Sequence, residues 1–213
     1  MVECIGLSGE DMPEANAVKV GIVGGTGQMG RWFETFFRDA GCRVIVSSRR
    51  TEISPEEMAK ECDVVMISVP INETCKVIER VGPYVREDGV ITDVTSIKEV
   101  PMKAMLEHSG AEVVGSHPVF GPSVKSMKGQ TVVLCPARGD RWFRWLKDIY
   151  ESHGAKVKIS TPEEHDRMMG IIQCLRHFST IVLGHAMMKL GADVKECLEF
   201  TSPIYRIRMD IRT

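Results

Sequence analysis

Polar side chains that could carry out acid–base chemistry are predicted where strands of a sheet end. Ser96 and Lys98 follow the apolar segment 89–93, and His117 follows the next short apolar segment. Pro118 restricts the backbone of His117 to extended conformations. A histidine held in this way could accept the proton of a hydroxyl while a hydride leaves the same carbon. A histidine that only hydrogen-bonds within its loop would show the same pattern, so both interpretations remain open from these residues alone.

A second group of polar residues lies on a long helical pattern that follows Pro162. Gln173 and His177 are four residues apart, so they share one face of that helix. Apolar residues surround His177, and a histidine in such a setting is more often part of a core than a ligand. His165 near the start of the helix cannot be assigned from the sequence. The histidines lack H-E-x-x-H or a similar spacing, so no metal site is predicted.

A glycine-rich turn joins an apolar strand to an amphipathic helix near the start of the chain. The segment 18–30 reads VKVGIVGGTGQMG, and a helix is expected from Met29 onward. In this context Gly25 permits the tight turn, Gly27 lets the backbone approach a pyrophosphate, and Gly30 lets the helix pack closely. A turn that binds nothing is the alternative. The cofactor-binding residues predicted here are Gly25, Thr26, Gly27, Gln28, Met29 and Gly30.

The end of the second predicted strand bears on which dinucleotide binds. An NAD site usually has an acidic residue there, about 20 residues beyond the glycine turn, that binds the ribose hydroxyls. Here Ser48, Arg49 and Arg50 occupy that position. Arginine pairs with a 2′-phosphate through charge-assisted hydrogen bonds, so we expect NADP, with NAD as the alternative. The segment 68–70 (Ser68, Val69 and Pro70) ends the next strand and is expected to flank the nucleotide.

The order of the predicted elements gives an α/β fold with a doubly wound, Rossmann-type parallel sheet. We expect an N-terminal extension over residues 1–17, a dinucleotide-binding domain over 18–160, and over 161–213 the start of a helical domain. The net charge of −2 gives no reason to expect nucleic acid or a membrane surface as a partner. Seven cysteines, odd in number and without C-x-x-C spacing, favour reduced thiols and a cytoplasmic location.

Several long stretches make the chain resemble prephenate dehydrogenase of tyrosine biosynthesis, especially the enteric type that is elsewhere fused to chorismate mutase. Residues 1–17 are too few for a mutase domain. The matching stretches are GIVGGTGQMGRWF, VVMISVPI, GVITDVTSIKEVPMKAML, VVGSHPVFGPSVKSMKGQTVVLCP, EHDRMMGIIQCLRHFSTIVLGHAM and TSPIYR.

The resemblance implies oxidative decarboxylation of prephenate to 4-hydroxyphenylpyruvate by a homodimer. It assigns His117 to the proton of the substrate 4-hydroxyl, with Ser96 as its neighbour in the same hydrogen-bonded site. It places Lys98, Gln173 and His177 in the substrate site. The family's carboxylate-binding arginine would fall one residue beyond Thr213. Arogenate dehydrogenase, another nicotinamide-dependent reductase and a non-catalytic nucleotide-binding fragment remain alternatives.

Overall fold

The computed structural model describes residues 13–200, which form two compact units. The first unit ends at Asp166 and the second begins at Arg167, six residues beyond the expected domain boundary at residue 160. Helix α6 (Pro162–Met169) therefore begins in the first unit and ends in the second.

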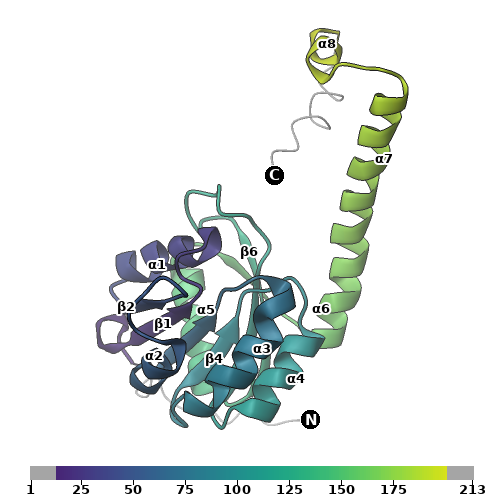
Figure 1. The fold of residues 1–213 in the computed structure, drawn as a ribbon. Coiled ribbons are helices and arrows are strands. Elements are labelled where there is room, and N and C mark those ends of the chain that lie inside the picture. Colours follow the sequence, from purple (N-terminus) through teal and green to yellow (C-terminus); the bar gives the residue numbers. More distant parts are fainter. Residues whose placement is uncertain (1–12, 201–213) are drawn as a thin grey trace, which may run out of the picture. The chain divides into compact units, whose positions relative to one another are not determined.

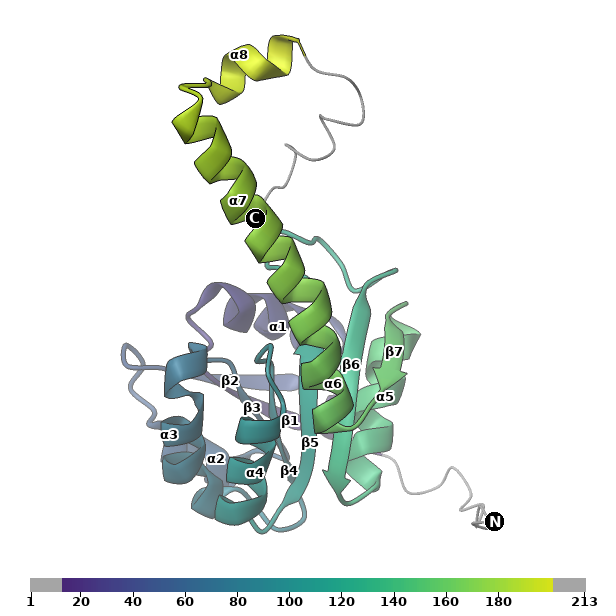
Figure 2. The ribbon, with the colours of Figure 1, turned by 90° about the vertical axis from the view of Figure 1, so that its right-hand side faces the viewer.

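The first unit is built on a seven-stranded sheet with the order β2-β1-β3-β4-β5-β6-β7 (Figures 1 and 2). The order reverses at β1, between the pairs β1–β2 and β1–β3, which is where open α/β sheets bind ligands at their carboxyl edge. The strands are β1 (Lys19–Val23), β2 (Arg43–Ser47), β3 (Val64–Ile67), β4 (Val90–Asp93), β5 (Glu112–Pro118), β6 (Thr131–Arg138) and β7 (Lys156–Ile159).

Helices cover both faces of this sheet, because alternate strand residues point to opposite sides (Figure 1). On one face, phenylalanines of α1 and tryptophans of α5 pack on residues such as Val20 and Met66. On the other face, Met58, Ile78 and Met105 of α2, α3 and α4 pack on the intervening strand residues. The helices of this unit are α1 (Gln28–Asp39), α2 (Pro55–Glu61), α3 (Ile71–Val81), α4 (Glu99–His108) and α5 (Arg141–Ser152), with 3₁₀ turns at Ala15–Ala17 and Gly82–Tyr84.

One strand pair in this mostly parallel sheet is antiparallel. Strand β6 runs antiparallel to β5, with His117 opposite Val133, whereas every other neighbouring pair is parallel. Parallel neighbours need a crossover connection, usually a helix. The connection over residues 119–130 contains only turns and bends, so the chain returns directly beside β5 in the opposite direction.

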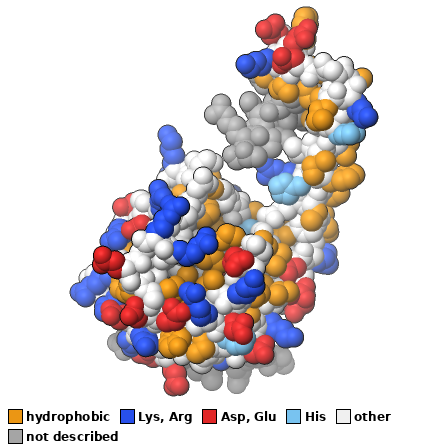
Figure 3. Space-filling view, in the orientation of Figure 1, with side chains coloured by type: hydrophobic (Ala, Val, Ile, Leu, Met, Phe, Trp, Pro, Cys, Tyr) orange, Lys and Arg blue, Asp and Glu red, His pale blue; other side chains and the backbone are white. Residues whose placement is uncertain are grey.

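The second unit is helical over its described part. After α6, a π-helical segment, η3 (Gly170–Cys174), leads into α7 (Leu175–Lys189), and α8 (Val194–Glu199) follows a short connection. Large apolar side chains of this unit are exposed, and Figure 3 shows them along α7. Phe178 and Ile181 are 66% and 69% exposed.

Candidate active site

The turn between β1 and α1 brings the backbone of the first strand close to the end of β3. Gly24 has φ of +81°, and a Cβ there would lie 2.3 Å from the backbone oxygen of Ser68. The left-handed residue of the turn is therefore Gly24, which directly precedes the three glycines of the predicted motif. Gly25 is required for a different reason, because a Cβ would lie 2.4 Å from the side chain of Val46 on β2.

The remaining glycines let α1 start directly above the turn. A Cβ on Gly30 would lie 2.5 Å from the oxygen of Gly24, so this glycine permits the close approach of helix and strand, as predicted. Gly27 is the N-cap of α1 and provides no side-chain hydrogen bond, and the first turn contains no acidic residue. The backbone N–H groups and the helix dipole at this end favour an anion such as a pyrophosphate.

A cavity of about 760 Å³ opens beside this turn, at the carboxyl ends of β1, β2 and β3. Nine of its lining residues belong to the three predicted cofactor-binding segments or adjoin them: Gly24, Thr26, Gly27, Ser48, Arg49, Arg50, Ser68, Val69 and Pro70. Gly25, Gln28, Met29 and Gly30 do not line it. The size of the cavity, the glycine turn and the helix terminus together fit the adenosine diphosphate part of a dinucleotide.

The wall of the cavity beyond β2 is formed by a short turn that exposes two guanidinium groups. Ser48 donates its backbone N–H to the hydroxyl of Thr51, and the Ser48 hydroxyl accepts from the backbone N–H of Arg50. Arg49 and Arg50 are exposed, and neither forms an ion pair with a described residue within 4 Å. Both are available to an anionic ligand, although Glu52 at the cavity wall adds a nearby negative charge.

His117 lies within β5 and is 4% exposed. The sequence predicted a loop position after a shorter strand; the antiparallel pairing with β6 extends β5 to Pro118 instead. Burial, together with the neighbouring His165 and Lys98, lowers the pKa of His117 to about 3, and Asp166 opposes this shift. The imidazole is therefore neutral near pH 7 and can accept a proton from a ligand.

A buried ion pair contacts the backbone of β5 next to this histidine. The Lys98 ammonium contacts the carboxylate of Asp93 and donates to the backbone oxygen of Ser116 at 2.8 Å. Both charged side chains are fully buried, and Thr95 bonds to the same carboxylate. Burial lowers the pKa of Lys98, and the Asp93 carboxylate counteracts that shift.

This position of Lys98 differs from the prediction that its side chain lines the substrate pocket. Its ammonium is directed into the core because Asp93 at the end of β4 and the backbone of β5 provide oxygen acceptors there. Ser96, on the same loop, is half-buried and forms no hydrogen bond with His117 among the described residues. Its role beside His117 remains a prediction.

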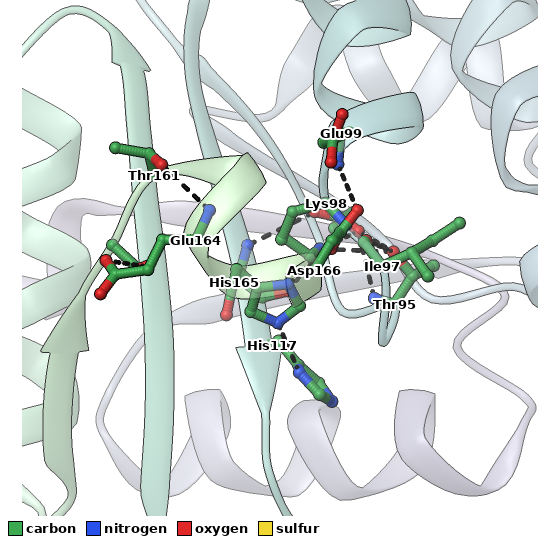
Figure 4. A network of polar contacts seen from close by, with 12 residues as sticks. Thr95, Ile97, Lys98, Glu99, His117, Thr161, Glu164, His165 and Asp166 are labelled. Carbon is green, nitrogen blue, oxygen red and sulfur yellow. Dashed lines mark hydrogen bonds and ion pairs between the residues drawn. The ribbon is translucent and has the colours of Figure 1, made fainter. Parts of the chain in front are cut away.

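The polar partner of His117 is a residue that the sequence left unassigned. His117 Nδ1 lies 2.8 Å from Nε2 of His165, and His165 Nδ1 lies 2.7 Å from the Asp166 carboxylate (Figure 4). Asp166 was not singled out at all. Adjacent histidine and aspartate at the start of a helix are a weak signal, and their approach to His117 depends on the placement of α6 after β7.

Gln173 and His177 belong to the second unit. Gln173 is half-buried within the π-helical segment, and His177 is exposed on α7. His177 is thus not enclosed by the apolar residues around it in sequence, and its assignment to the substrate site remains a prediction.

Among residues 13–200 there is no cluster of three or more His, Cys, Asp or Glu side chains arranged to hold a metal ion. Over the same residues no helix has the length and apolar character needed to cross a membrane.

The sheet, the glycine turn and the cavity at the strand ends define a Rossmann-type nucleotide-binding domain. Sequence comparison identifies its kind: the pattern of the prephenate dehydrogenase nucleotide-binding domain matches residues 34–159, and that of the prephenate dehydrogenase dimerization domain matches residues 161–213. The chain belongs to the prephenate dehydrogenase family.

Curated relatives agree with this assignment. A probable arogenate/prephenate dehydrogenase of Methanocaldococcus jannaschii is 41% identical over 211 residues, covering 90% of this chain and 47% of the relative. The T-protein of Haemophilus influenzae is 40% identical over 192 residues, covering 90% of this chain and 51% of the relative. The chain thus spans about half the length of these relatives.

Solved structures share the fold at lower identity. Prephenate dehydrogenase of Aquifex aeolicus, crystallised with hydroxyphenyl propionate and NAD⁺, is 22% identical with a TM-score of 0.69, covering 84% of this chain and 73% of that one. Arogenate dehydrogenase of Synechocystis is 20% identical with a TM-score of 0.71, covering 90% of this chain and 78% of that one.

Proposed function

We propose that this chain carries the active site for oxidative decarboxylation of prephenate to 4-hydroxyphenylpyruvate. The observation that carries the proposal is His117, a buried and neutral imidazole on β5, in the same sheet whose strand ends line the nucleotide cavity. Membership of the family and the names of the curated relatives support the choice of substrate. Arogenate is the second candidate, because the relative from Methanocaldococcus jannaschii is named for both substrates.

A bound nicotinamide supplies a hydride acceptor, and the chain's own residues handle the proton. As the C4–H bond of prephenate breaks, His117 accepts the proton of the 4-hydroxyl group, and a C4–oxygen double bond develops. The bond between C1 and its carboxylate then breaks, and CO₂ leaves. The electron pair of that bond makes the ring aromatic, and the phenolic oxygen recovers the proton from His117. No proton is gained or lost overall.

The test is turnover by the purified chain. We expect reduced nicotinamide to form when prephenate is supplied with an oxidised cofactor, and 4-hydroxyphenylpyruvate to accumulate in equal amount. Arogenate is assayed in parallel, and the larger kcat/KM identifies the preferred substrate. Binding of cofactor without turnover of either substrate would reject the proposed reaction and favour a non-catalytic nucleotide-binding chain.

We further propose that the cofactor is NADP, with NAD as the alternative. Arg49 and Arg50 line the cavity at the end of β2, where an NAD site usually has a carboxylate. The Aquifex aeolicus structure contains NAD⁺, so a relative with this fold accepts the other cofactor. The choice in this chain depends on its own two arginines.

Removal of these arginines is expected to abolish a preference for NADP. Each charged hydrogen bond to a 2′-phosphate contributes about 1.5–3 kcal/mol, so the Arg49→Ala/Arg50→Ala variant should lose about tenfold or more in NADP affinity. NAD affinity should hardly change. Arg43→Ala is the matched control, because Arg43 is exposed at the opposite end of the same strand. Titration of both cofactors decides the matter, and tighter binding of NAD by the unmodified chain would reject the proposal.

The exposed apolar side chains of α7 support a proposed homodimer formed through the helical unit. Residues 161–213 match a dimerization domain, and Phe178 and Ile181 would be covered by a second copy. We expect Phe178→Glu/Ile181→Glu to weaken dimerisation by at least about tenfold, since each buried apolar side chain contributes roughly 1.5–3 kcal/mol. Thr180→Glu, on the other side of α7, is the control. Sedimentation at several concentrations measures the effect; a monomeric unmodified chain would contradict the prediction.

A further inference from the structure

A chain of three side chains connects His117 to the start of α4, and the proposed reaction uses only the first of them. His165 is 2% exposed and lies between His117 and Asp166. Asp166 continues the chain, because its two carboxylate oxygens accept the backbone N–H groups of Lys98 at 2.6 Å and Glu99 at 3.0 Å (Figure 4). Lys98 is the N-cap of α4 and has no side-chain cap of its own, so Asp166 satisfies this helix end from α6.

The charge state of Asp166 determines the direction of the hydrogen bonds. Partial burial raises the pKa of this carboxyl, but hydrogen bonds from the Glu99 backbone, from His165 and from the Lys98 backbone hold it below its usual value. An ionised carboxylate can only accept hydrogen bonds. His165 must therefore carry a proton on Nδ1 and donate it to Asp166.

The same reasoning gives the direction of the hydrogen bond between His165 and His117. A neutral His165 with its proton on Nδ1 has a lone pair on Nε2, and this lone pair faces His117 Nδ1 at 2.8 Å. With His165 neutral, its Nε2 can only accept a hydrogen bond. His117 must then donate from Nδ1, which leaves a lone pair on its Nε2.

We propose that His165 and Asp166 are positioning residues, which hold His117 in the tautomer protonated at Nδ1 and so keep Nε2 free to accept the substrate hydroxyl proton. The inference rests on the proposed function for the identity of the ligand. The Asp166 carboxylate also favours the imidazolium that forms when His117 accepts a proton. Because Asp166 caps α4, the loop that carries Ser96 is tied to the same histidine pair.

The first test needs no substitution and no turnover. Nitrogen-15 NMR of the histidine rings in the unmodified chain with bound cofactor distinguishes a protonated ring nitrogen from one with a lone pair. We expect His117 to have its proton on Nδ1 and His165 to have one proton, also on Nδ1. A proton on His117 Nε2, or a doubly protonated His165 near pH 7, would overturn the inference.

Substitutions test which side chain imposes the tautomer. His165→Leu removes the acceptor, so the His117 signals should shift to a mixture of tautomers and kcat should fall by roughly 10- to 100-fold. Cofactor affinity should stay near its original value, since His165 is not among the lining residues of the nucleotide cavity. His165→Gln provides an oxygen acceptor near the position of Nε2. This variant should restore most of kcat and the original His117 NMR signals. Equal damage by leucine and glutamine would indicate a packing role and contradict the proposal.

Asp166 is tested by removal of its charge. Asp166→Asn should release the tautomer of His165 and, through it, that of His117. Glu163→Gln is the matched control, because Glu163 is an exposed carboxylate in the same turn of α6.

The NMR result also separates this inference from the proposed function. His117 protonated at Nδ1 in a chain that does not oxidise prephenate would support the positioning role and reject the reaction, whereas turnover with His117 protonated at Nε2 would do the reverse.

Discussion

Replacement of His117 by asparagine is expected to lower kcat for prephenate by about 10²–10⁴-fold, the usual contribution of a general base. Asparagine is polar and of similar size, but its amide cannot accept a proton. Burial lowers the pKa of His117 and so keeps the imidazole neutral, which is the state that can accept a proton. Steady-state kinetics with saturating cofactor measure the loss.

Cofactor affinity should hardly change in this variant, because His117 is not among the residues that line the nucleotide cavity. His153→Asn is the control for the substitution itself, since His153 is exposed at the end of α5 and bonds only within that segment. Fluorescence titration of the cofactor is compared across the three proteins. A variant that retains the original kcat would remove His117 from the mechanism.

Local patterns were sufficient to predict the strand, the glycine turn and the helix beside the cavity. The strand, glycine turn and helix over residues 18–40 are contiguous in sequence, and their geometry follows from sterics at a few glycines. The left-handed conformation of Gly24 was not predicted, because consecutive glycines look alike until Ser68 and Val46 are placed around them.

The half of the site around His117 depends on contacts between distant segments. Lys98 and Asp93 are five residues apart, but their burial depends on β5, which covers the ammonium with the Ser116 carbonyl. The contact between His117 and His165 spans 48 residues. This contact forms because β6 runs antiparallel beside β5. Strand β7 then pairs with β6, and α6 follows β7 in the chain. No periodicity in the sequence reports this return, so the partner of His117 could not be predicted.

The buried ion pair beneath His117 leads to the second large effect, which concerns stability. Lys98→Met keeps the length of the side chain and removes its charge, which leaves the fully buried Asp93 carboxylate without its cation. Loss of one partner from a buried pair typically costs about 3–5 kcal/mol. We therefore expect the free energy of unfolding to fall by about that amount, measured by urea denaturation with fluorescence and circular dichroism together.

Lys147→Met is the matched control for this prediction. Lys147 lies 2.7 Å from Glu151 on the surface of α5, where both side chains remain partly exposed. A surface pair of this kind contributes about 0–1 kcal/mol, so the same substitution should change stability little. The contrast between the two lysines isolates burial as the cause, because residue type, substitution and ion-pair partner class are matched. If the two variants unfold at similar urea concentrations, the Lys98 ammonium is not a structural cation, and its predicted role in the substrate site regains support.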